Sequence, residues 1–262
     1  QHEYFASVIS GIQKVAFKKG YDMTFVGGDS KKNYDYYSHT LARHYDGVAI
    51  LSCDFSSSGI VELIKSDIPT VTLDYAFDSK HSAVLSDSEA GIRELLEYVI
   101  SMGHTKIAMI HGEETWVTEQ RVSSFKKTCS QHGLSIPENY FLEVLYHDAE
   151  GCLIATEKLL ELEEPPTCIF YPDDFAALGG IRELNNRNLI PGKDISIVGY
   201  DGINLTSMML APLTTYAQNG KLIGETMADT LFRQIEQGNI FSPKTEFING
   251  MMIKGGTVAK IN

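Results

Sequence analysis

Short apolar runs rich in β-forming residues alternate with helix-period stretches along the whole of this chain. Their hydrophobic character is continuous rather than alternating, as expected for parallel strands covered on both faces. This alternation predicts an α/β architecture built from doubly wound parallel sheets. We expect strands at MTFVGG (23–28), GVAIL (47–51), TVTLD (70–74), AVLSD (83–87), KIAMIHG (106–112), FLEVL (141–145), TCIFYP (167–172) and ISIVGYD (195–201).

Two of the intervening stretches have clear helical signatures. Between residues 5 and 16, apolar side chains recur three and four positions apart, and Gly20 provides a C-terminal stop. Between residues 88 and 102, Ser88 can cap a helix whose apolar stripe ends before Gly103. The sequence begins directly in the first of these helices, so the strand expected to lead into it is missing.

The chain length bounds the number of domains. With 262 residues, 43% of them hydrophobic, the chain can form one or two domains of roughly 150 residues. Near its C-terminal end, LTTYA at 213–217 leads into an amphipathic helix at 219–237, and another apolar run follows at 245–253. We interpret these late elements as crossovers between two α/β lobes joined by several short strands. The expected lobes are residues 1–102 plus 218–246, and residues 103–217 plus 247–262.

Charge and composition exclude several classes of protein. The 34 acidic and 22 basic residues give a net charge of −12, which argues against DNA binding through this chain's own surface. No run approaches the length of about 18 apolar residues that a membrane span needs, so we expect no membrane partner. Four scattered cysteines without CxxC spacing indicate reduced thiols in a cytoplasmic protein. Because residue 1 is not methionine, a removed leader peptide stays possible.

Catalytic and cofactor motifs are absent. The sequence contains no GxSxG, HExxH, GxxxxGK[ST] or GxGxxG, and its eight histidines show no metal-ligand spacing. We therefore expect no catalytic residues, no cofactor and no metal site. An enzyme that works through aspartates alone is a minor alternative, which turnover of a candidate sugar would test.

Acidic residues stand at the ends of most predicted strands. In an open parallel sheet, ligands bind beyond the carboxyl ends of the strands. A carboxylate accepts hydrogen bonds from neighbouring hydroxyls, so acids converging on a cleft suit a polyhydroxy ligand. Each aspartate can equally be a helix N-cap, because strand-to-helix turns are where such caps occur. The residues concerned are Asp29, Asp54, Asp74, Asp87, Asp173, Asp174 and Asp201.

Two further residues follow the KIAMIHG run. Arg121 is expected just inside the next helix, where a cation in the first turn opposes the helix dipole. This favours a role in holding a ligand over that of an ordinary surface charge. Trp116, the only tryptophan, is expected in the preceding loop, where it either stacks on a sugar face or covers the core.

One long segment carries a family resemblance. The run PDDFAALGGIRELNNRNLIPGKDISIVGYDGINLTSMMLAPLTT at 172–215 resembles the effector-binding domain of the lactose/galactose-repressor family. That family has an Asn-Asp pair, a MALG helix, a DISVVGYDD strand and PPLTT in this order. Residues 2–22, 86–112 and 117–134 resemble three other segments of the same domain, so the match covers nearly the whole chain.

The resemblance implies a fold and a set of ligand contacts. The fold is a two-lobed, type I periplasmic-binding-protein-like domain whose first strand is absent from this sequence. Arg121, Asp173 and Asp201 match the usual effector contacts of the family. Asp173 replaces the family's Asn, which removes a donor and adds a charge, so the identity of the ligand cannot be transferred. Further ligand contacts are expected at Tyr4, Asp87 and Ser88, with Trp116, Phe170 or Tyr200 offering a stacking face.

The function implied is effector sensing in a bacterial transcriptional regulator. The effector is expected to be a carbohydrate that changes the angle between the lobes of a cytoplasmic homodimer. Operator DNA would be bound by a helix-turn-helix headpiece that is absent here. A secreted sugar-binding component of a transport system shares this architecture and is the alternative; the gene upstream of residue 1 would distinguish them. If the domain is the effector sensor of a regulator, Arg121→Ala is expected to abolish the response to the effector with little loss of melting temperature.

Overall fold

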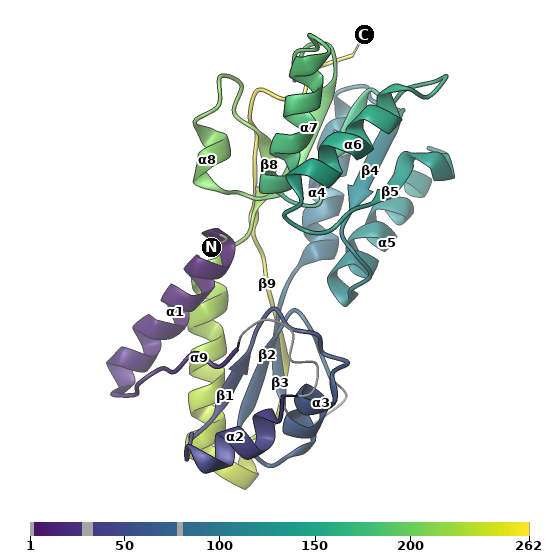
Figure 1. Cartoon of the computed structure of the whole chain (residues 1–262). Helices are drawn as coiled ribbons and strands as arrows, with labels where there is room; N and C mark the ends of the chain where they lie inside the picture. The colour runs from purple at the N-terminus through teal and green to yellow at the C-terminus, as the bar shows by residue number, and fades with distance from the viewer. Residues whose placement is uncertain (1–2, 28–33, 78–80, 262) are drawn as a thin grey trace. The chain divides into compact units, whose positions relative to one another are not determined.

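The computed structural model describes residues 3–27, 34–77 and 81–261, which form two compact α/β units (Figure 1). The first unit comprises Gln1–Ser86 and Asn219–Ile248, and the second comprises Asp87–Gln218 and Asn249–Asn262. The chain therefore passes from one unit to the other three times. The α/β fold with two largely parallel sheets confirms the predicted class.

The first unit contains a four-stranded parallel sheet. Its order is β1 (Val48–Ile50), β2 (Thr70–Leu73), β3 (Ser82–Ser86) and β9 (Thr245–Ile248). One face packs on the paired helices α1 (Glu3–Lys19) and α9 (Gly220–Gln237). The other packs on α3 (Ser58–Lys65), which contacts α2 (Tyr36–Ala42).

Strand β1 shows how the sequence produces these two faces. Successive side chains of a strand point to opposite sides. Ile50 accordingly packs with Leu63 of α3, whereas Ala49 and Leu51 pack with the cluster formed by α1 and α9. Both sides of the strand are covered by apolar side chains, which explains the continuous hydrophobic run in the sequence.

One predicted strand is not formed. The MTFVGG run at 23–28 has no strand assignment at residues 23–27, and residues 28–33, including Asp29, lie outside the described chain. The physical reason is that a strand requires a hydrogen-bonded neighbour, and residues 23–27 have no ladder partner among the described residues.

The second unit contains a six-stranded sheet. Its order is β10 (Met251–Ile253), β8 (Thr214–Ala217), β7 (Ser196–Asp201), β6 (Cys168–Phe170), β4 (Ile107–His111) and β5 (Phe141–Glu143). All neighbouring strands are parallel except β10, which runs antiparallel to β8. The sequence predicts a purely parallel sheet, and the antiparallel edge strand corrects that prediction. The apolar run at 245–253 is therefore two strands, one in each unit.

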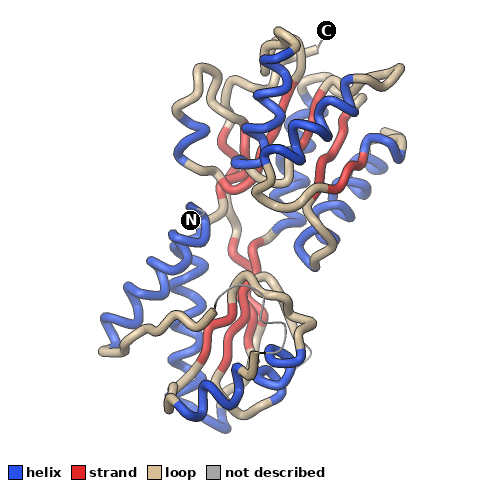
Figure 2. Tube along the Cα trace, viewed as in Figure 1, coloured by secondary structure: helices blue, strands red, loops and turns tan. Residues whose placement is uncertain are grey.

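Helix pairs cover the two faces of this second sheet. On one face α4 (Ser88–Ser101) packs with α5 (Trp116–Gln131), and on the other α6 (Ala149–Leu160) packs with α7 (Asp174–Asn186). The short α8 (Asn204–Ser207) follows β7, and 3-10 turns lie at Glu138–Tyr140 and Gly238–Ile240. Figure 2 shows the same alternation of helices and strands within each unit.

The boundary between the units differs from the expected one. The sequence places residues 88–102 in the first lobe, but α4 lies in the second unit. Its apolar stripe, which includes Leu95 and Leu96, is buried against Phe125 of α5 and Ile107 of β4. Periodicity showed which face of this helix is buried, but not which sheet covers it.

Within the described ranges no helix combines the length and apolar character that a bilayer span needs. The four cysteines are free thiols, and three of them are buried. Burial raises the pKa of the Cys129 thiol to about 11, which makes it a poor nucleophile at neutral pH.

Candidate functional site

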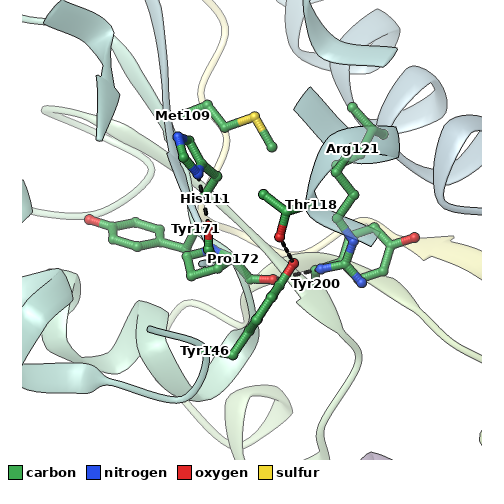
Figure 3. A pocket seen from close by; sticks show the side chains of 10 residues that line it. Met109, His111, Thr118, Arg121, Tyr146, Tyr171, Pro172 and Tyr200 are labelled. Atoms are coloured by element: carbon green, nitrogen blue, oxygen red, sulfur yellow. Dashed lines mark hydrogen bonds between the residues drawn. The ribbon is translucent and has the colours of Figure 1, made fainter. Parts of the chain in front are cut away.

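The carboxyl ends of β4, β6 and β7 lie at one edge of the second unit, where they surround a small cavity (Figure 3). The cavity volume is about 10 Å³, which is room for about one water molecule. The cavity is therefore too small to hold a sugar ring. Its lining residues are Ile92, Met109, His111, Gly112, Thr118, Arg121, Tyr146, Tyr171, Pro172 and Tyr200.

Arg121 is held between aromatic rings. Its guanidinium carbon lies 3.7 Å from the centroid of the Tyr200 ring and 5.7 Å from that of Tyr146. The Nη1 group donates a hydrogen bond of 2.9 Å to the carbonyl oxygen of Pro172. With only 6% of its surface exposed, Arg121 is not an ordinary surface charge. Stacking on aromatic faces is a property of the planar guanidinium that lysine does not share.

The helix register corrects two expectations about this region. Helix α5 begins at Trp116, so Arg121 lies in its second turn and the dipole argument for a first-turn cation does not apply. Trp116 is the first residue of the helix rather than part of a loop. The N-cap is Thr115, whose hydroxyl accepts a hydrogen bond from the Thr118 amide, so the helix begins earlier than the sequence indicated.

Tyr146 is a member of the cluster that the sequence did not reveal. Its hydroxyl lies 3.0 Å from the Thr118 hydroxyl, which donates to the Glu113 carbonyl oxygen. The Tyr146 amide donates to the Glu113 carboxylate, so hydrogen bonds hold both the backbone and the side chain of this residue. Tyr146 follows β5, and the rule that ligand groups follow strand ends would have found it.

Asp173 is the N-cap of α7. One carboxylate oxygen accepts a 2.8 Å hydrogen bond from the Ala176 amide, and the other accepts one of 2.8 Å from the His147 amide. The His147 Nδ1 atom lies 3.2 Å from the same carboxylate. Burial opposes ionisation, but the hydrogen bonds and charge of His147 bring the pKa of Asp173 below its usual range. The helix-capping interpretation left open for Asp173 is thus realised.

Asp174, the next residue, is fully buried. Its carboxyl group accepts hydrogen bonds from the Thr215 hydroxyl and, at 2.9 Å, from the Ile203 amide. Burial raises the pKa of Asp174 to about 8, although the bond from Thr215 opposes this shift. Asp174 thereby connects the start of α7 to β8 and to the loop that follows β7.

Asp201 has a strained backbone. It ends β7 with φ of 101°, a conformation that residues other than glycine rarely adopt. The Gln218 amide group donates a 2.6 Å hydrogen bond to its carboxylate, and the Gln218 backbone amide donates to its carbonyl oxygen. Sparsely populated backbone conformations of this kind cluster at functional sites.

The remaining predicted site residues have different surroundings. Phe170 is a core residue, 2% exposed, with its ring edge-to-face against Phe125. Asp87 is the N-cap of α4, and Ser88 is buried beside it. Tyr4 belongs to the first unit, where its hydroxyl donates to Asp74 at 3.4 Å.

Arg121, Asp173 and Asp201 all belong to the second unit. Arg121 contacts Pro172, which precedes Asp173, and Tyr200, which precedes Asp201. No group of three His, Cys, Asp or Glu side chains suited to a metal ion occurs within the described ranges. The groups near this edge of the sheet are the Arg121 guanidinium, the carboxylates of Asp173 and Asp201, and the side-chain amide of Gln218. Groups of these kinds form hydrogen bonds with polar ligands.

Comparison with known proteins agrees with this description. Residues 96–258 match the family described as periplasmic binding protein-like domain. The HTH-type transcriptional repressor PurR of Aliivibrio fischeri is 30% identical over 240 residues, which cover 89% of this chain and 71% of the repressor. A LacI transcriptional regulator from Bacillus cereus subsp. cytotoxis superposes with a TM-score of 0.92 at 26% identity, over 100% of this chain and 94% of that one.

A third relative contains a ligand. A LacI family regulator from Enterococcus faecium, solved with bound ribose, has a TM-score of 0.87 at 23% identity, over 99% of this chain and 95% of that one. The fold and the site define a periplasmic-binding-protein-like effector domain. The chain belongs to the LacI family of transcriptional regulators, as the effector-binding domain, so it is not an enzyme. Regulators of this family bind small effectors and DNA as dimers.

Proposed function

We propose that this domain senses a carbohydrate and that the sugar is held by Arg121 and Asp201 of the second unit. The observation that carries the proposal is the placement of the Arg121 guanidinium on the Tyr200 ring, with the strained Asp201 next in the chain. A guanidinium offers five donors and a carboxylate offers acceptors, and sugar hydroxyls need both. The ribose bound by the Enterococcus faecium regulator supports the same ligand class.

Asp173 would contribute differently from Arg121 and Asp201. Both of its carboxylate oxygens are already engaged by the amides of Ala176 and His147. We therefore assign it mainly to positioning the β5–α6 loop beside the site. We keep four further residues as proposed ligand contacts, namely Asp87, Ser88, Tyr4 and Trp116. Phe170 would affect the site only through its packing in the hydrophobic core.

Operator DNA is proposed to bind elsewhere in the full-length regulator. The net charge of −12 makes this domain a poor surface for phosphates. We propose that the regulator acts in the cytoplasm as a homodimer. The transport-component alternative is disfavoured because the relatives described above are regulators of transcription.

The test is a thermal-shift screen of this chain against mono- and disaccharides, followed by Arg121→Lys. A ligand that binds only the native state raises stability by RT ln(1 + [L]/Kd), about 2.7 kcal/mol at 100 times Kd. Lysine keeps the charge but loses the planar fork, so the sugar-induced shift should disappear. Arg121→Ala is a poorer test than the sequence indicated, because removing a side chain that is 6% exposed also leaves a cavity.

Arg182→Lys is the matched control for this experiment. Arg182 is an exposed arginine on α7 that pairs only loosely, at 3.5 Å, with Glu150. Its substitution should leave the sugar-induced shift unchanged. If the sugar raises the melting temperature of Arg121→Lys as much as that of the parent, Arg121 does not bind the sugar. If no sugar in the panel raises the melting temperature of the parent, the proposed ligand class is wrong.

A further inference from the structure

The buried carboxylate of Asp173 holds His147 at two points. Its Oδ2 atom accepts a 2.8 Å hydrogen bond from the His147 backbone amide, and its Oδ1 atom lies 3.2 Å from the imidazole Nδ1 atom. The Asp173 side chain is 1% exposed, whereas that of His147 is 34% exposed. Capping of α7 needs only the hydrogen bond from the Ala176 amide to Oδ1. The two contacts with His147 therefore go beyond what the start of the helix requires.

His147 occupies a strained position in a turn. The Asp148 amide donates to the Leu145 carbonyl oxygen at 3.3 Å, so Tyr146 and His147 are the central residues of this turn. His147 has φ of 60°, a conformation that turns usually assign to glycine or asparagine. Such a conformation persists only where surrounding contacts fix it. Asp173 supplies two of these contacts, one to the backbone and one to the ring.

The same turn carries Tyr146 beside Arg121. The Tyr146 ring centroid lies 5.7 Å from the guanidinium carbon of Arg121. The Arg121 Nη1 group also donates to the carbonyl oxygen of Pro172, the residue before Asp173. Arg121 therefore contacts both of the segments that the pair of Asp173 and His147 joins.

Three carboxylates from different elements act on the His147 ring. Burial opposes protonation of this ring, but the hydrogen bond and charge of Asp173 outweigh burial and raise the pKa of His147 above its ordinary value of 6.5. Asp201 at the end of β7 and Glu113 after β4 act in the same direction. Asp148, the next residue in the chain, caps the start of α6. When the pH rises above the pKa of His147, the ring loses its charge and the ion pair with Asp173 is lost.

We propose that His147 is a positioning residue for the effector. Its protonated ring, paired with Asp173, fixes the turn that holds Tyr146 beside Arg121. Effector binding weakens when His147 loses its proton, because the strained turn then loses the ion pair that holds it. This inference rests on the proposed function, since it takes Arg121 as a contact of the effector. It makes the domain sensitive to pH as well as to its ligand.

Three substitutions test the pair with little change in side-chain shape. His147→Asn puts an amide nitrogen near the position of Nδ1 and tolerates positive φ, but it cannot gain a charge. Asp173→Asn keeps an oxygen for the cap of α7 and removes the negative charge. Asp148→Asn is the matched control, because it removes the charge of another N-cap one residue from His147.

The first measurement needs no ligand. An NMR titration follows the His147 imidazole, and hydrogen exchange gives the protection factors of the amides of residues 146 and 147. The pKa of His147 should lie above 6.5 in the parent, fall in Asp173→Asn and change little in Asp148→Asn. In the parent, the protection factor of the residue 147 amide should fall about fivefold or more as the ring loses its proton. In His147→Asn it should stay constant over the same pH range.

The second measurement is the affinity for ribose, the sugar bound by the Enterococcus faecium regulator, determined by calorimetry between pH 6 and pH 9. Over this range the affinity of the parent should fall about fivefold more than that of His147→Asn. The comparison is necessary because Asp174, with a pKa of about 8, titrates in the same window. The fall should occur at lower pH in Asp173→Asn and should match the parent in Asp148→Asn.

The outcomes separate this inference from the proposed function. Parallel pH profiles of the parent and His147→Asn would overturn the inference, and so would a pKa of His147 that Asp173→Asn leaves unchanged. If ribose does not bind, the sugar of the panel with the largest thermal shift replaces it. If no sugar binds, the proposed function fails, and the protection factors alone decide whether His147 fixes the turn.

Discussion

At the scale of single residues, the buried carboxyl group of Asp174 sets a clear pH dependence. Its pKa is about 8 in the folded protein because of burial, against an ordinary value of 3.8. Between these values the folded state binds a proton that the unfolded chain does not. The contribution of Asp174 to stability therefore falls as the pH rises through this window, and it becomes constant above it.

Asp174→Asn tests this titration, because asparagine keeps a neutral group that can still pair with Thr215 and the Ile203 amide. The free energy of unfolding, measured with urea, should rise for the variant relative to the parent as the pH increases from 4 to 8. Above about pH 8 the difference should level off. A difference that stays constant across this range would mean that Asp174 is ionised in the folded protein.

The sequence places aspartates at the ends of strands, where the structure has them, but it does not give the partners of each side chain. Acids at strand ends and Arg121 were identified, and the second unit brings Arg121 close to the residues preceding Asp173 and Asp201. The engagement of Asp173 by His147 was not predictable, because that contact depends on how the β5–α6 loop folds over α7. No periodicity in the sequence encodes the geometry of such a loop.

At the scale of elements, α1 and α9 approach closely through two glycines. A methyl group at Gly11 would overlap the Lys221 carbonyl oxygen, and one at Gly224 would overlap that of Val8. Gly11→Ala should therefore push the helices apart and lower the free energy of unfolding by about 1–3 kcal/mol. Chemical denaturation measures this loss. Gly27→Ala, where a methyl group meets nothing within 4 Å, should be nearly neutral, and equal effects would contradict the close contact.

Strand prediction succeeded where neighbours exist and failed where they do not. The runs at 70–74 and 195–201 became central strands because both of their backbone edges are paired. The run at 23–28 has the same apolar character, but no strand beside it is described. Apolar pattern alone therefore predicts which segments can be strands, whereas ladder formation depends on a neighbour elsewhere in the chain.

At the scale of the whole molecule, the two units differ in how completely their cores are closed. The second unit has a six-stranded sheet with a buried cluster on each face. The first has four strands, an edge at β1 and a groove of about 800 Å³ beside it. Fewer buried apolar contacts beside an open groove lower the free energy of local unfolding.

This difference predicts that the first unit unfolds at a lower urea concentration than the second. Trp116 is the only tryptophan and lies in the second unit, so its fluorescence reports that unit alone. Far-UV circular dichroism reports the helices of both units. The dichroism should therefore begin to fall before the fluorescence changes, and the fluorescence midpoint should coincide with the later part of the dichroism transition. Coincident curves would show that the two units unfold in one cooperative transition. The groove would then not lower the stability of the first unit below that of the second.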